Sequence, residues 1–69
     1  MKQIPISEAK RIAIKYGYSQ IIIVGRMVGE SGGEHVTTYG IDKENRDVAA
    51  RIGDFLKYKI MGWAEEKTI

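Results

Sequence analysis

Two runs of β-favouring residues, joined by a glycine-rich loop, occupy residues 19–41, which read SQIIIVGRMVGESGGEHVTTYGI. The first run extends from Ser19 to Val28 and is rich in isoleucine and valine. The second extends from His35 to Ile41 and contains valine, threonine and tyrosine. Such residues favour strands, and the polar loop from Gly29 to Glu34 between them is typical of a hairpin turn. We therefore predict an antiparallel β-hairpin at the centre of the fold.

A symmetric loop would set the register of this hairpin by placing Val28 opposite His35 and Val24 opposite Tyr39. Because side chains alternate across a strand, one face of the sheet would then carry Ile22, Val24, Arg26, Val28, His35, Thr37, Tyr39 and Ile41. The opposite face would carry Gly25 and Gly40, which have no side chain and allow a helix backbone to approach closely. We therefore predict that the core of the chain lies on the Gly25/Gly40 face.

A helix is predicted on each side of the hairpin in the sequence. The first begins with Ser7 as its N-cap and ends at Tyr16, before Gly17. The second begins near Asp42 or Asn45, and it extends to about Met61, before Gly62. Its apolar stripe consists of Val48, Ile52, Phe55, Leu56, Lys59, Ile60 and Trp63, beside the small residues Ala49 and Gly53.

These elements define a small α+β fold of the order (β)αββα. The first strand is optional, because residues 2–6 alternate like a strand but contain Pro5, which would restrict the segment to a sheet edge. The sheet therefore has two or three antiparallel strands, and we expect both helices to cover one of its faces. We predict a single domain over residues 1–69, with an ordered core at about residues 4–63 and a frayed tail at 64–69.

The composition limits both the size of the core and the classes of function. The chain has 69 residues, no cysteine and a net charge of +2, and a domain of this size buries only about 60% of its unfolded surface. Without cysteine it has no disulfide and no thiolate metal site. The longest apolar run, Ile21 to Val24, is far shorter than a membrane span. We expect a cytoplasmic protein with no membrane partner and no cofactor.

No residue pattern points to catalysis. His35 is the only histidine, the acids nearest to it in the sequence lie in the glycine-rich loop, and the three serines occupy a cap, a strand start and a loop. A nucleophile, a base and an orienting group should all be recognisable in an enzyme. We therefore expect neither an enzyme nor a metal site. The loop from Gly29 to Glu34 joins two strands rather than a strand and a helix, which argues against a phosphate-binding loop.

Two sets of residues are candidates for binding. In the first, Arg26, His35, Thr37 and Tyr39 share the predicted outer face of the sheet, where a guanidinium and a tyrosine ring are suited to an anionic signalling nucleotide. In the second, Lys10, Arg11 and Lys15 lie within two turns of the first helix and, together with Arg26, form a candidate nucleic-acid surface. The small charge excess and the interleaved acids of the second helix weaken the second alternative.

A self-association surface is predicted from the apolar character of both sides of the first strand. If both helices cover the Gly25/Gly40 face, then the side chains of Ile22, Val24, Val28 and Ile41 stay exposed on the other face. Burying about 300 Å² of such surface per chain would contribute on the order of 7 kcal/mol before the entropy of association is subtracted. We therefore expect a homo-oligomer, with dimers as the simplest form.

Much of the chain resembles a family of short hypothetical proteins encoded by tailed phages and prophages. The resemblance rests on residues 35–45, HVTTYGIDKEN, on residues 47–63, DVAARIGDFLKYKIMGW, and on residues 6–13, ISEAKRIA. No activity or binding residue comes with that family. The resemblance implies only a context, in which small phage proteins bind and block a host factor or sequester a signalling molecule in the host cytoplasm. A non-catalytic, homo-oligomeric binding module is the function that we expect.

Overall fold

The computed structural model describes residues 2–29 and 32–63. In chain order it contains helix α1 (Ile6–Tyr16), strands β1 (Gln20–Met27) and β2 (Gly33–Gly40), helix α2 (Lys43–Phe55) and a π-helical turn η1 (Leu56–Ile60). The two strands pair in an antiparallel sheet. The predicted α+β class and the order helix, strand, strand, helix are confirmed. The optional strand at residues 2–6 is not formed, and the tail at 64–69 lies outside the described residues.

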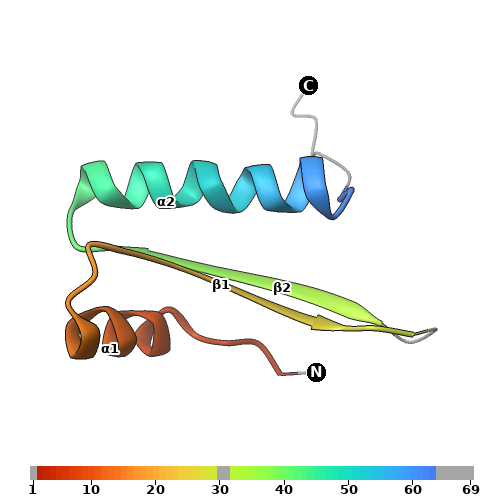
Figure 1. Ribbon diagram of the computed structural model, residues 1–69, viewed down its shortest axis with the longest axis horizontal. Coiled ribbons are helices and arrows are strands. Elements are labelled where there is room, and N and C mark those ends of the chain that lie inside the picture. Colours follow the sequence, from red (N-terminus) through yellow and green to blue (C-terminus); the bar gives the residue numbers. More distant parts are fainter. Residues whose placement is uncertain (1, 30–31, 64–69) are drawn as a thin grey trace.

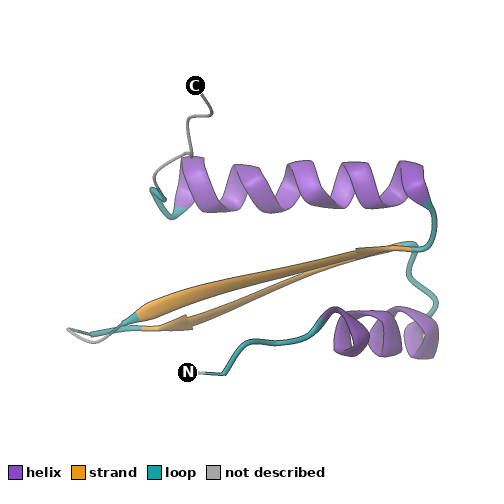
Figure 2. Cartoon of the chain, turned by 180° about the vertical axis from the view of Figure 1, so that it is seen from behind, coloured by secondary structure: helices purple, strands orange, loops and turns teal. Residues whose placement is uncertain are grey.

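The chain forms three layers, with the sheet between the two helices (Figure 1). Helix α2 covers one face of the sheet, and α1 together with the N-terminal segment, residues 2–5, covers the other. The view from behind shows the same separation (Figure 2). Our expectation that both helices share one face is wrong. Since β1 has isoleucines on both faces, each face of the sheet needs its own cover, and each helix supplies one.

The hairpin register differs from the predicted one by three residues. Val24 lies opposite Val36, and Gly25 lies opposite His35, because β2 already begins at Gly33 and the loop is shorter than its composition implies. An odd shift moves every side chain of one strand to the other face relative to its partner. The face under α2 therefore carries Ile22, Val24, Arg26, Glu34, Val36 and Thr38, and the face over α1 carries Ile21, Ile23, Met27, His35, Thr37 and Tyr39.

Helix α1 begins and ends at backbone-defined positions. Pro5 is its N-cap and makes no side-chain capping bond, so the predicted cap at Ser7 is wrong by two residues. Proline suits this end because its fixed φ leads into the helix and its missing N–H loses nothing there. At the other end, Gly17 has a φ of 79° and its N–H donates to the Ala13 carbonyl. The predicted C-terminal cap is confirmed.

Close backbone contact fixes α2 on β2. A Cβ atom at Gly40 would overlap the backbone nitrogen of Arg46 and the carbonyl carbon of Asn45, and a Cβ at Gly53 would lie 2.8 Å from the Thr38 methyl. Gly40 thus has the role that the sequence predicts for it. Gly25 does not, since a Cβ there would find only the Ile4 side chain, at 3.9 Å.

The C-terminal part of the predicted second helix is wound differently from the rest. The α-helix ends at Phe55 and continues as the π-helical turn, in which the Met61 N–H donates to the Leu56 carbonyl. One extra residue in a turn rotates everything that follows. The rotation brings Trp63 back toward the sheet, where its indole N–H donates to Glu34 Oε1 at 2.7 Å.

Asp42 caps α2, as predicted, and this cap makes helix stability depend on pH. Its Oδ1 accepts hydrogen bonds from the backbone and the side chain of Asn45, which hold the pKa of the Asp42 carboxyl below its ordinary value. A lowered folded-state pKa stabilises the protein above the unfolded-state pKa, about 3.9, and the contribution disappears as the pH falls through the folded-state value.

We expect the Asp42→Asn variant, whose cap does not titrate, to serve as a pH-independent reference. The melting temperature of the unmodified protein, measured relative to this variant, should fall as the pH is lowered below about 4. Asp42→Ala should melt below both at pH 7. A difference between the unmodified protein and Asp42→Asn that is constant from pH 7 to pH 2 would contradict this role of the carboxylate.

Only small apolar residues are fully enclosed in the described part of the chain. Its buried hydrophobic residues are Ala9, Ala13 and Ala49, and no large side chain is fully buried. Several large apolar residues, among them Ile6, Ile14, Val28 and Phe55, are more than half exposed. The core is therefore thin, and much apolar surface stays exposed.

Candidate functional site

His35 and Thr37 bind the N-terminal segment rather than facing solvent. The Ile4 N–H donates to His35 Nε2 at 2.9 Å, and Thr37 Oγ1 donates to the Ile4 carbonyl at 2.6 Å. His35 Nε2 also lies 2.7 Å from Thr37 Oγ1. Thr37 is only 4% exposed. Both side chains thus join the N-terminal segment to β2.

Arg26 lies on the opposite face of the sheet from these residues. Its Nε donates to Glu34 Oε2 at 2.8 Å, and Glu34 also accepts the bond from Trp63. The predicted ligand set of Arg26, His35, Thr37 and Tyr39 is therefore not brought together within one chain. The cause is the three-residue shift in register, which leaves Tyr39 opposite Ile21 and Arg26 opposite Glu34.

A shallow hollow of about 300 Å³ lies at the loop end of the sheet. It is lined by Arg26, Met27, Val28, Gly29, Gly32, Gly33, Glu34 and Met61. Lys57 Nζ lies 5.7 Å from the Trp63 ring nearby, and the Glu34 carboxylate joins the two strands to the C-terminal segment. Sequence reasoning missed this cluster. The signal was Trp63, whose indole N–H needs an acceptor when the ring packs against the protein.

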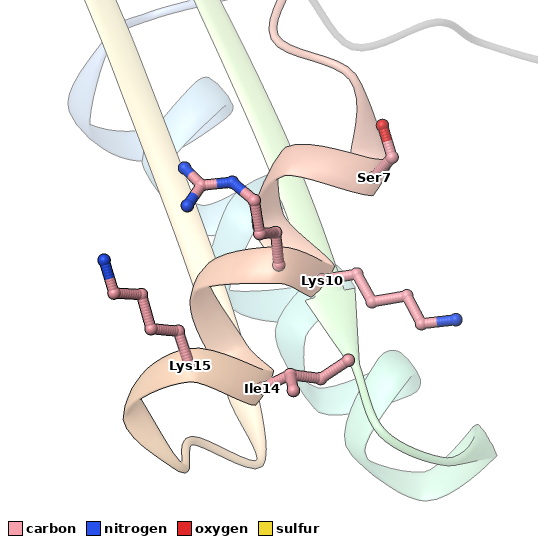
Figure 3. A pocket seen from close by; sticks show the side chains of 5 residues that line it. Ser7, Lys10, Ile14 and Lys15 are labelled. Carbon is pink, nitrogen blue, oxygen red and sulfur yellow. The ribbon is translucent and has the colours of Figure 1, made fainter.

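The basic residues of α1 do form one surface. A hollow of about 450 Å³ lies over the side of the helix that faces away from the sheet, and Ser7, Lys10, Arg11, Ile14 and Lys15 line it. Lys10 and Ile14 project to one side of α1 and Lys15 to the other (Figure 3). We call these five residues the α1 outer surface. Of the predicted nucleic-acid set, three residues lie here, and Arg26 lies on the far face of the sheet.

One local ion pair orients the Arg11 guanidinium on the α1 outer surface. Arg11 Nη2 lies 3.0 Å from Glu8 Oε2, and their hydrogen bonds raise the pKa of the Arg11 guanidinium and lower the pKa of the Glu8 carboxyl. Both groups are solvent-exposed, so the pair fixes orientation more than it stabilises the fold. Between the cations, the Ile14 side chain is 69% exposed. The surface thus combines positive charge with an apolar centre.

The four residues of the predicted oligomer interface do not share a face. Ile22 and Val24 lie on the face under α2, Val28 is exposed just beyond the end of β1, and Ile41 follows β2. Within residues 2–29 and 32–63, histidine, aspartate and glutamate form no group of three or more that is suited to a metal ion. No helix in that same part of the chain combines the length and the hydropathy needed to cross a bilayer.

Comparison with known proteins gives no relative, because no family model, curated protein or solved structure matches this chain.

Proposed function

We propose that this chain is a non-catalytic binding module whose α1 outer surface docks an acidic partner protein. One observation supports the proposal above others: an exposed isoleucine, Ile14, lies among Lys10, Arg11 and Lys15 on a face that the rest of the fold leaves uncovered. If the chain is phage-encoded, then a host factor is the natural partner, and its acidic surface is what the module blocks.

The α1 outer surface has the composition of a protein interface. Protein interfaces combine an apolar centre with a polar rim, and arginine is enriched in them. Here Ile14 is the apolar centre, and Ser7 and the three cations are the rim. Complementary charge would speed the encounter with an acidic partner, and burial of Ile14 would then contribute to affinity. A small anion has less to gain, because side chains on an exposed helix face enclose it poorly.

Nucleic-acid binding is the second candidate, and the clustering of Lys10, Arg11 and Lys15 on one face of α1 favours it. Phosphate contacts need only the cations and weaken steeply with salt. An acidic protein partner needs Ile14 as well. The two candidate functions therefore differ in whether they require the apolar side chain of Ile14.

The substitution Ile14→Lys separates the two functions. It adds a cation and removes the apolar centre at a position that is exposed, so the fold should be unaffected. We expect it to weaken binding of a synthetic helical peptide of glutamate and leucine by about tenfold or more. Binding of a short DNA duplex should instead be unchanged or stronger. Both are measured by NMR titration of the isotope-labelled protein at two salt concentrations.

The matched control is Ile60→Lys, which makes the same chemical change at an exposed isoleucine of the π-helical turn. It should leave peptide binding unchanged. If the duplex binds the unmodified protein in a salt-dependent way and the peptide does not, then the nucleic-acid alternative replaces the proposal. Equal loss of peptide binding in both variants would also contradict it, because the loss would then not be specific to the α1 outer surface.

A further inference from the structure

Among the residues that the structure describes, backbone groups at four positions on the outer edge of β1 have no partner. In an antiparallel pair, alternate residues direct their N–H and C=O toward the neighbouring strand. The Ile41 N–H donates to the Ser19 carbonyl, so the odd-numbered residues of β1 face β2. The even-numbered residues Gln20, Ile22, Val24 and Arg26 therefore direct theirs outward. This strand contains neither proline nor lysine, the residues that often protect a free edge.

An apolar flank of α2 lies above this same edge. Asn45, Val48, Ile52 and Phe55 follow the i, i+3, i+7, i+10 spacing of one helix flank. Asn45 Oδ1 accepts a hydrogen bond from Gln20 Nε2 at 2.8 Å, which places the flank over β1, while Gly53 lies against Thr38 and Val36 of β2. Ile52 and Phe55 are 41% and 57% exposed. The flank is thus an apolar surface beside a free strand edge.

We propose that a second copy of this chain occupies this surface by pairing its β1 with β1 in the antiparallel sense. The result is a continuous four-stranded sheet in the order β2, β1, β1, β2, with both α2 helices on one face and both α1 helices on the other. Ile52 and Phe55 of the two copies then meet across the two-fold axis. The α1 outer surface stays free, so this inference is independent of the proposed function.

The pairing is centred on Ile23. Both α2 helices lie on the same face of the joined sheet only if even-numbered residues of one β1 pair with even-numbered residues of the other β1. Of the possible centres, Ile23 is the one that pairs all four outward-facing residues of each copy. Gln20 then lies opposite Arg26 of the second copy, and Ile22 lies opposite its Val24. No like charges meet, because the single cation of β1 falls beside a neutral amide. The edge is therefore complementary to itself.

Spacing and exposed apolar side chains also favour a second copy. Strands lie about 4.8 Å apart, so two helices centred over adjacent hairpins lie roughly 10 Å apart, which is a normal helix packing distance. Close to the free edge, Val24, Ile52 and Phe55 are 40%, 41% and 57% exposed. A second copy would cover these apolar side chains together with the free strand edge.

The first test is sedimentation equilibrium of the full chain at micromolar concentrations. We expect a mass twice the 7.8 kDa of the chain. Ile52→Glu, at a side chain exposed in the single chain, should give a folded monomer, and Ile14→Glu, on the α1 outer surface, should stay dimeric. A monomeric unmodified protein overturns the proposal. So does an Ile52→Glu variant that still dimerises, or a dimer that dissociates only with Ile14→Glu.

Amide hydrogen exchange supplies a second test with an internal folding control. The Ile22 and Val24 N–H groups point outward and should exchange about a hundredfold more slowly in the unmodified protein than in Ile52→Glu. The Ile23 N–H faces β2 and should be protected in both. Rapid exchange at Ile22 and Val24 in a dimeric unmodified protein would place the interface elsewhere and overturn the proposal.

Discussion

Gly40→Ala should strongly destabilise the protein. A Cβ at this position overlaps backbone atoms of Asn45 and Arg46 in the first turn of α2. Backbone atoms cannot rotate away as a side chain can, so α2 must move off β2. We expect a loss of about 3 kcal/mol or more, against a total stability of roughly 3–10 kcal/mol for a domain of this length. Chemical unfolding followed by circular dichroism measures the loss.

Two other glycines make this prediction a graded series. Gly25→Ala places its Cβ 3.9 Å from the Ile4 side chain, which is ordinary contact, and should leave stability nearly unchanged. Gly53→Ala meets the Thr38 methyl at 2.8 Å, a clash with a side chain that alanine's better helix propensity partly offsets. The expected order of stability is Gly25→Ala, then Gly53→Ala, then Gly40→Ala. Equal stability of the Gly25 and Gly40 variants would show that α2 does not approach β2 this closely.

The elements that the sequence predicts correctly are those with local signals. Gly17 ends α1 because its left-handed conformation suits glycine, and Asp42 begins α2 because its carboxylate can accept an N–H within three residues. Both signals operate within one turn of helix. The π-helical turn has no comparable signal, and neither does the contact of Trp63 with Glu34, which closes over 29 residues.

The register could not be predicted because composition misplaces the hairpin loop. Gly33 and Glu34 are poor strand formers, so the sequence assigns them to the loop. In the structure both belong to β2, where Glu34 pairs with Arg26 and accepts the Trp63 bond. Long-range contacts outweigh local preference here. The same three-residue difference separates Arg26 from His35, and with it the predicted anion site is lost.

The apolar character of both faces of β1 predicts that each face needs a cover. The prediction that a second copy covers one of them is wrong, because a helix covers each face. Ile21 and Ile23 point to one face and Ile22 and Val24 to the other. The sequence indicates that two covers are needed, and it does not distinguish a second helix from a second copy. In the structure α1 covers one face and α2 the other (Figure 1). What is left for a second copy is the strand edge rather than a whole sheet face.

Thr37→Val should weaken the attachment of the N-terminal segment and lower the melting temperature. Valine keeps the shape of threonine but loses the hydroxyl that donates to the Ile4 carbonyl at 2.6 Å. An unsatisfied polar group at a site this buried costs about 1–3 kcal/mol, which corresponds to a decrease on the order of 10 °C for a small domain. Differential scanning calorimetry measures the melting temperature, and hydrogen exchange at the Ile4 amide reports on the segment itself.

Thr37→Ser separates the hydroxyl from the methyl group. Serine keeps the donor and loses only packing, so its melting temperature should lie closer to that of the unmodified protein than to that of Thr37→Val. The Ile4 amide bonds to His35 Nε2 rather than to Thr37, and it should lose protection in Thr37→Val, because the segment is then held at one point instead of two. If serine and valine are equally destabilising, or if the Ile4 amide is equally protected in all three proteins, then the Thr37 hydroxyl does not hold the segment, and the bond to His35 and packing retain it.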